Sequence, residues 1–145
     1  MSSSPFPADG QNSRSRERIR TVVVASHDDL AHEVASRIAT LIRARASSGE
    51  RVVLGLATGS TPIGVYRELI RLHREDGLSF RNVVSFNLDE YWPMANDSIH
   101  SYHRFMWENL FSHVDIDAHN VHIPDGTWAR DRIDDACRAY EAALV

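Results

Sequence analysis

Lysine is missing from this chain of 145 residues, because all 16 of its basic residues are arginine. A Schiff base with a carbonyl substrate requires the primary amine of a lysine, so the sequence excludes enzymes that form one on their own chain. The 20 acidic residues outnumber the basic ones and give a formal net charge of −4. This balance argues against nucleic acid or an anionic membrane as the main partner, since both favour clustered basic charge.

Cysteine and long apolar segments are also scarce. The one cysteine, Cys137, cannot form an internal disulfide, and the printed sequence contains neither a membrane-spanning run nor the apolar region of a secretory signal. We therefore expect a cytoplasmic protein with no membrane partner. Cys137 falls in an apolar helical pattern within residues 133–144, which predicts a core residue and not a nucleophile.

The remaining pattern predicts one α/β domain. Residues 1–20 are rich in Ser, Pro and Arg without periodicity and are predicted to form a disordered tail. Residues 21–145 alternate strand-like and helix-like segments, which predicts an open, mostly parallel, Rossmann-like sheet with helices on both faces. The periodic pattern of the last helix runs to the end of the chain without a Gly or Asn cap, so the domain is expected to be truncated.

Four strands are expected, and each is followed by a helix. The predicted strands are 21–25, 52–56, 83–88 and 120–123. The second and third are apolar without alternation, as is typical of central strands buried on both faces. Ser26 and Asp29 form a capping box for the first helix, whose predicted buried face consists of Leu30, Val34, Ile38, Leu41 and Ile42.

A hydroxyl-rich turn follows the strand at 52–56. Its residues are Thr58, Gly59, Ser60 and Thr61, and Pro62 is expected to open the next helix with Thr61 as its N-cap. Free backbone N–H groups at such a helix start favour a bound phosphate. The turn has neither the lysine of a P-loop nor the glycine spacing of a dinucleotide fold. The alternative is a plain strand-to-helix turn whose hydroxyls satisfy local backbone.

Two carboxylates, Asp89 and Glu90, stand where the strand at 83–88 ends. Ligands of open α/β sheets bind at this edge, and the turn at 58–61 leaves its strand at the same edge. Because neighbouring strand residues point in opposite directions, we expect one carboxylate to have a chemical role and the other a structural one. The eight histidines show no spacing typical of a metal site, and no metal is expected.

Two motifs together resemble the glucosamine-6-phosphate deaminase family. They are Leu-Ala-Thr-Gly-Ser-Thr-Pro at 56–62 and Phe-Asn-Leu-Asp-Glu-Tyr at 86–91, followed by Ser101-Tyr102 and Phe105-Met106. The related 6-phosphogluconolactonases have a similar loop but carry Asp-Glu-Arg where this chain has Asp-Glu-Tyr at 89–91. Non-catalytic sugar-phosphate-sensing domains share the architecture and remain a second alternative.

The resemblance implies an enzyme that converts glucosamine 6-phosphate to fructose 6-phosphate and ammonia without a cofactor. Asp89 would move a proton between C2 and C1, the turn at 58–61 would hold the phosphate, and Glu90 and Tyr91 would support the site. The implied partner is a small sugar phosphate, and the full-length form could be a homo-oligomer.

One part of the family pattern has no counterpart in this chain. The family carries a later Gly-rich stretch with an Asp, a His that assists ring opening and a Glu that supports this His, and nothing after Asp125 matches it. The chain therefore resembles the first half of the enzyme. We expect either a fragment of a longer gene product or a truncated relative, inactive when alone.

Overall fold

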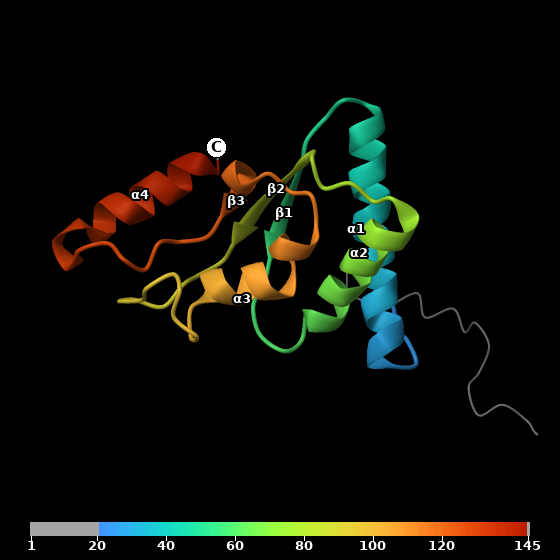
Figure 1. Ribbon diagram of the computed structural model, residues 1–145, viewed down its shortest axis with the longest axis horizontal. Coiled ribbons are helices and arrows are strands. Elements are labelled where there is room, and N and C mark those ends of the chain that lie inside the picture. Colours follow the sequence, from blue (N-terminus) through green and yellow to red (C-terminus); the bar gives the residue numbers. More distant parts are fainter. Residues whose placement is uncertain (1–20, 145) are drawn as a thin grey trace, which may run out of the picture.

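Three parallel strands form one sheet in the computed structural model, which describes residues 21–144 (Figure 1). The strands are β1 (Val52–Leu56), β2 (Val83–Asn87) and β3 (Val121–His122), in the order β1-β2-β3. Val52 is paired with Val83 and Ser85 with Val121. The strands at 52–56, 83–88 and 120–123 were thus predicted to within one or two residues.

Helices flank the sheet on both sides, as predicted. They are α1 (His27–Ser47), α2 (Ile63–Asp76), α3 (Tyr102–Asn109) and α4 (Ile133–Ala143), with single 3₁₀ turns at η1 (Phe111–His113), η2 (Ala118–Asn120) and η3 (Arg130–Arg132). In Figure 1, α1 and α2 lie together on one side of the strands and α4 lies on the other. The α/β class is confirmed.

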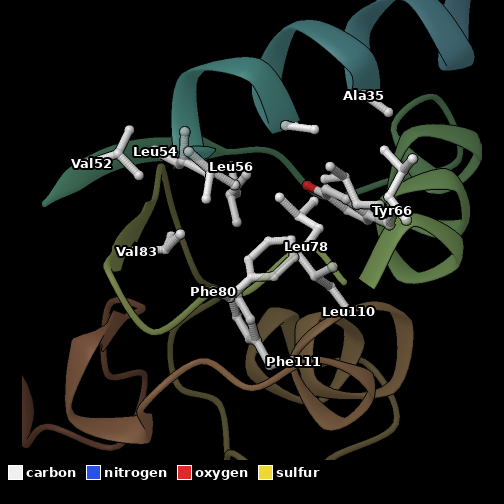
Figure 2. Packing of buried hydrophobic residues seen from close by; sticks show 14 of the residues in the cluster. Ala35, Val52, Leu54, Leu56, Tyr66, Leu78, Phe80, Val83, Leu110 and Phe111 are labelled. Carbon is white, nitrogen blue, oxygen red and sulfur yellow. The ribbon is translucent and has the colours of Figure 1, made fainter. Parts of the chain in front are cut away.

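The main core fills the space between β1, α1 and α2. Alternate β1 side chains point into it and meet Tyr66 and Leu69 of α2 and Phe80, as Figure 2 shows for part of the cluster. At the crossing of the two helices, a Cβ on Gly64 would lie 3.1 Å from the Cβ of Ala31. The helices therefore approach closely because small residues face each other.

This close approach corrects the predicted face of α1. Of the predicted residues, Ile42 is buried and Ile38 packs against the core, whereas Leu30 and Leu41 are exposed. The other buried residues of α1 are Ala31, Ala35 and Ala39. The capping box is confirmed, since the Ser26 hydroxyl accepts a hydrogen bond from the Asp29 backbone N–H. The prediction placed the largest apolar residues on the buried face of the helix. Close contact with the helix that carries Gly64 instead favours small side chains on that face.

The strand expected at 21–25 is wrong. Residues 21–24 have no regular structure, and Val23 is exposed. A β-branched segment becomes a strand only where a neighbour completes its hydrogen bonds, and within residues 21–144 the sheet has only β1, β2 and β3. The predicted tail at 1–20 lies outside the described residues. Within the described part of the chain, every helix is too short or too polar to cross a membrane.

The apolar sequence of β1 is typical of a strand buried on both faces, but only one face is buried within the described residues. Val52, Leu54 and Leu56 are buried, but Val53 between them is 62% exposed, and Gly55 is exposed as well. β2 differs, since all its residues are buried or half-buried. One face of β1 is therefore part of the core and the other is open.

Candidate functional site

The turn after β1 presents its backbone at the start of α2. Gly59 has a φ of +101°, a left-handed conformation that disfavours residues with a Cβ. Thr58 is half-buried, whereas Gly59, Ser60 and Thr61 are exposed. The N-cap is Pro62 and has no side-chain cap bond, so the expectation of Thr61 as N-cap is wrong. Among the described residues, no side chain accepts a hydrogen bond from the first backbone N–H groups of α2.

Two buried side chains fix the strand end that leads into this turn. The Tyr66 hydroxyl donates a hydrogen bond to the Ala57 carbonyl, and burial raises the pKa of Tyr66 to about 12. The Asn87 side-chain N–H₂ donates to the Leu56 carbonyl over 2.9 Å. The turn is thus anchored from α2 on one side and from β2 on the other.

Glu90 is fully engaged in holding α3. Its Oε1 accepts hydrogen bonds of 2.9 Å from the backbone N–H groups of Tyr91 and Tyr102, and its Oε2 accepts one of 2.9 Å from His103. The Ser101 hydroxyl caps the same helix by accepting from Arg104. Glu90 is therefore a structural carboxylate that neutralises the amino end of α3.

Asp89 stands in a different environment. It is exposed and lies on the wall of a cleft of about 550 Å³ between the loops after β2 and β3 and helix α4. Within residues 21–144, its carboxylate makes no hydrogen bond or ion pair. Of the two carboxylates, Asp89 is thus the one that is exposed and without a partner among the described residues.

A tyrosine pair links the β1 turn to the segment that carries Asp89. The Tyr102 hydroxyl donates to the Tyr91 hydroxyl over 3.1 Å, and the ring centroids are 4.8 Å apart. The pKa of Tyr102 is raised, chiefly by this hydrogen bond and also by burial and the charge of Asp89, while the nearby Thr58 side chain acts in the opposite direction. Thr58, Tyr91 and Tyr102 therefore converge near Asp89.

Tyr102 is the candidate residue that reasoning from the sequence missed. The sequence named it only within the family motif, beside Ser101 and before Phe105 and Met106, and no role in the site was predicted for it. Its position directly after Ser101, at the first residue of α3, was the available signal. A side chain there faces the carboxyl edge of the sheet instead of the core.

The loops after β2 and β3 are held against each other. Met94 donates a backbone hydrogen bond to Gly126 over 2.8 Å, and the Trp92 indole N–H donates to the Trp128 carbonyl over 2.9 Å. A Cβ on Gly126 would lie 2.5 Å from the Tyr91 carbonyl oxygen, so only glycine fits at this position. This contact fixes the loop on which Asp89 lies.

The expected site residues do not share one cavity. The 550 Å³ cleft is lined by Asp89, Glu90 and Tyr91 but not by the turn at 58–61. Cys137 also lines it and is exposed, which corrects its predicted place in the core. The apolar stripe of α4 reaches the sheet through Tyr140, whose hydroxyl donates to the Asn87 carbonyl over 2.6 Å. Among the described residues, no group of three or more potential metal ligands occurs.

Comparison with known proteins gives a consistent result. Residues 25–145 match the family model described as glucosamine-6-phosphate isomerases/6-phosphogluconolactonase. The chain is 41% identical to glucosamine-6-phosphate deaminase of Parabacteroides distasonis and 42% identical to that of Treponema denticola. Each match covers 87% of this chain and 46% of the relative.

Solved structures agree with these matches. A monomeric glucosamine-6-phosphate deaminase superimposes with a TM-score of 0.77 at 38% identity, over 83% of this chain and 48% of that one. The 6-phosphogluconolactonase of Thermotoga maritima gives 0.65 at 26% identity, over 84% and 51%. The chain thus spans about half the length of these relatives.

Proposed function

Because this chain belongs to the glucosamine-6-phosphate isomerase/6-phosphogluconolactonase family, we propose that it provides the phosphate turn and the proton-transfer base of a glucosamine-6-phosphate deaminase. The observation that carries this proposal is the contrast between two adjacent carboxylates. Glu90 accepts three backbone hydrogen bonds, whereas Asp89 is exposed in a cleft. A base must be within reach of the substrate and free to accept a proton.

Asp89 would act on the open-chain sugar. Its carboxylate would take the proton from C2 and return it to C1, and the resulting imine at C2 would then be hydrolysed to the ketose with release of ammonia. The sugar must be held so that C1 and C2 both lie within reach of one carboxylate. Positioning of this kind can lower a barrier by roughly 7–11 kcal/mol.

The turn at 58–61 would hold the phosphate. Its left-handed glycine allows a ligand to approach the backbone, and the uncapped start of α2 supplies N–H donors and the positive end of a helix dipole. Each such interaction favours an anion by about 0.3–2 kcal/mol. Tyr102 is hydrogen-bonded to Tyr91 and lies near the Thr58 side chain, so it would act as a positioning residue between the phosphate turn and the segment that carries Asp89.

A lactonase is the competing enzyme, and its reaction gives a different product. The deaminases of Parabacteroides distasonis and Treponema denticola and the deaminase structure are more similar to this chain than the lactonase structure is. A deaminase releases ammonia from glucosamine 6-phosphate. A lactonase would instead hydrolyse 6-phosphogluconolactone and release none.

The test of the base is Asp89→Asn in the gene product that carries this sequence. We expect ammonia release to fall by at least 100-fold while binding of glucosamine 6-phosphate is retained, since the amide keeps the shape but cannot accept the proton. The matched control is Asp97→Asn, which changes an exposed aspartate in the same segment between β2 and α3 but outside the cleft that Asp89 lines. Unaltered turnover in Asp89→Asn, or lactone hydrolysis without ammonia release, would refute the assignment.

The phosphate turn has a test of its own. Gly59→Val should weaken binding of glucosamine 6-phosphate at least tenfold, because the side chain blocks approach of the phosphate to the backbone. Gly49→Val is the matched control, since Gly49 also has a positive φ of 68° and open space at its Cβ position but lies after α1. Equal loss of affinity in both variants would show backbone strain instead of a lost phosphate contact.

A further inference from the structure

The loops after β2 and β3 meet at a glycine that has no room for a side chain. A Cβ on Gly126 would lie 2.5 Å from the Tyr91 carbonyl oxygen, 2.9 Å from the Met94 carbonyl oxygen and 2.8 Å from the Met94 Cβ. Gly126 is buried and is not one of the glycines with a positive φ. Space alone therefore requires glycine here, because the backbone does not occupy the left-handed region that disfavours other residues.

Two hydrogen bonds join the same loops on either side of this contact. The Met94 backbone N–H donates to the Gly126 carbonyl over 2.8 Å, and the Trp92 indole N–H donates to the Trp128 carbonyl over 2.9 Å. These two bonds and the close contact at Gly126 form a unit that we name the loop clamp. All three of its contacts on the loop after β2 are made by residues that closely follow Asp89.

Asp89 depends on its backbone for its position. Its side chain is exposed, and within residues 21–144 its carboxylate makes no hydrogen bond or ion pair. A carboxylate without partners is aimed only by the segment that carries it. β2 holds the residues before Asp89, Glu90 ties the next residue to α3, and the loop clamp holds the residues that follow.

We propose that Gly126 is a positioning residue for proton transfer by Asp89. The loop clamp would hold the backbone behind Asp89 so that one carboxylate reaches both C1 and C2 of the open-chain sugar. A displacement of about 1 Å can slow such a reaction by about 100-fold. This inference rests on the proposed function, and it concerns the chemical step and not the binding of phosphate, because no residue of the turn at 58–61 belongs to the clamp.

The test is Gly126→Ala in the gene product that carries this sequence. We expect the kcat for ammonia release per folded molecule to fall by about tenfold or more. The KM for glucosamine 6-phosphate should change by less than about threefold, since the added Cβ contacts the loop that carries Asp89 and not the phosphate turn. Hydrogen exchange at the Met94 amide should become faster, because this amide belongs to the clamp. An unchanged kcat, or a loss confined to KM, would overturn the proposal.

Two further variants separate positioning from loss of stability. Ile42→Ala removes a buried side chain of α1 that belongs to neither loop. It should lower the unfolding temperature but leave kcat per folded molecule unchanged. If it lowers kcat as much as Gly126→Ala does, the proposal is wrong.

Trp92→Phe loosens the clamp without adding an atom to the contact at Gly126. It removes the hydrogen bond to the Trp128 carbonyl but keeps an aromatic ring in the cleft. We expect kcat to fall by about threefold or more with little change in KM. This variant decides the question if Gly126→Ala does not fold, and an unchanged kcat in Trp92→Phe would then overturn the proposal.

The pH profile of kcat distinguishes a displaced base from an altered one. Gly126→Ala keeps Asp89, so the acidic limb of the profile should stay at the same pH while the plateau falls. A shifted limb would show a changed environment of the base instead of a changed position, and it would overturn the proposal. A parent that releases no ammonia refutes the proposed function and this inference with it. A parent that releases ammonia, with the same kcat in Gly126→Ala, refutes this inference alone.

Discussion

The two faces of the sheet differ in how they are covered. Under α1 and α2, the side chains of Val52, Leu54 and Leu56 are buried in one continuous cluster. On the other face, α4 has no buried residue and is joined to the strands chiefly through Tyr140. On the first face, one pair of helices is enough to bury the inward-facing side chains of β1. On the second face, Val53 and Gly55 stay exposed within the described residues.

The largest expected effect is from Leu69→Ala, which removes a fully buried side chain of α2 from the covered face. We expect it to lower the free energy of unfolding by about 2–5 kcal/mol through lost burial and a residual cavity. The matched control is Leu144→Ala beside α4, where the side chain is 55% exposed and the cost should be below about 1 kcal/mol. Urea denaturation of both variants measures the difference, and similar losses would mean that the two faces do not differ.

A second prediction concerns the helix cap at the site. Glu90→Ala leaves the backbone N–H groups of Tyr91, Tyr102 and His103 without their acceptor. We expect it to lower the free energy of unfolding by about 1–3 kcal/mol. Glu108→Ala is the control, since Glu108 is exposed and paired only with Arg104 on the same helix. Denaturation monitored by tryptophan fluorescence is suitable because Trp107 lies on α3. A cost no larger than that of the control would remove the structural role assigned to Glu90.

Reasoning from the sequence predicted where strands and helices lie along the chain better than it predicted what each of them packs against. The three observed strands could be predicted because short apolar runs before Gly, Pro or Asp have few other structures available. The strand at 21–25 has the same composition and fails, since a strand also needs a partner that composition does not reveal. The face of α1 was misassigned because the fit of Ala31 to Gly64 depends on a crossing of two helices.

The candidate site was predictable to a similar degree. Alternation along a strand indicated that Asp89 and Glu90 would differ, but only the structure identifies Glu90 as the one bonded to the backbone of α3. The convergence of Tyr102 on Thr58 and Tyr91 involves three separate segments. No local pattern in the sequence encodes such a convergence.

A third, smaller effect depends on pH and concerns the loop that supports the covered face. Asp115 accepts hydrogen bonds from the Phe80 backbone N–H and the Ser79 hydroxyl. Burial alone would raise the pKa of Asp115, but these bonds and the charge of His73 together lower it. The folded state thus favours the carboxylate, and the stabilisation present above the unfolded pKa of about 4 is lost as pH falls through the lower folded value.

Asp115→Asn tests this pH dependence. The variant should be less stable than the parent by about 1–2 kcal/mol near neutral pH. The two should converge as the pH is lowered below about 4, where the unfolded carboxyl becomes protonated. Thermal unfolding between pH 3 and pH 7 measures both curves. A constant gap across this range would mean that the contribution of Asp115 does not depend on its charge.

The smallest effect is expected on the open face, at Cys137 of α4. Its exposure predicts that Cys137→Ser changes the free energy of unfolding by less than about 0.5 kcal/mol. The same exposure predicts that a maleimide reagent modifies Cys137 in the native protein at a rate close to that in denaturant. Slow modification in the native protein would mean that α4 packs more closely than the structure describes, and the contrast between the two faces would then fail.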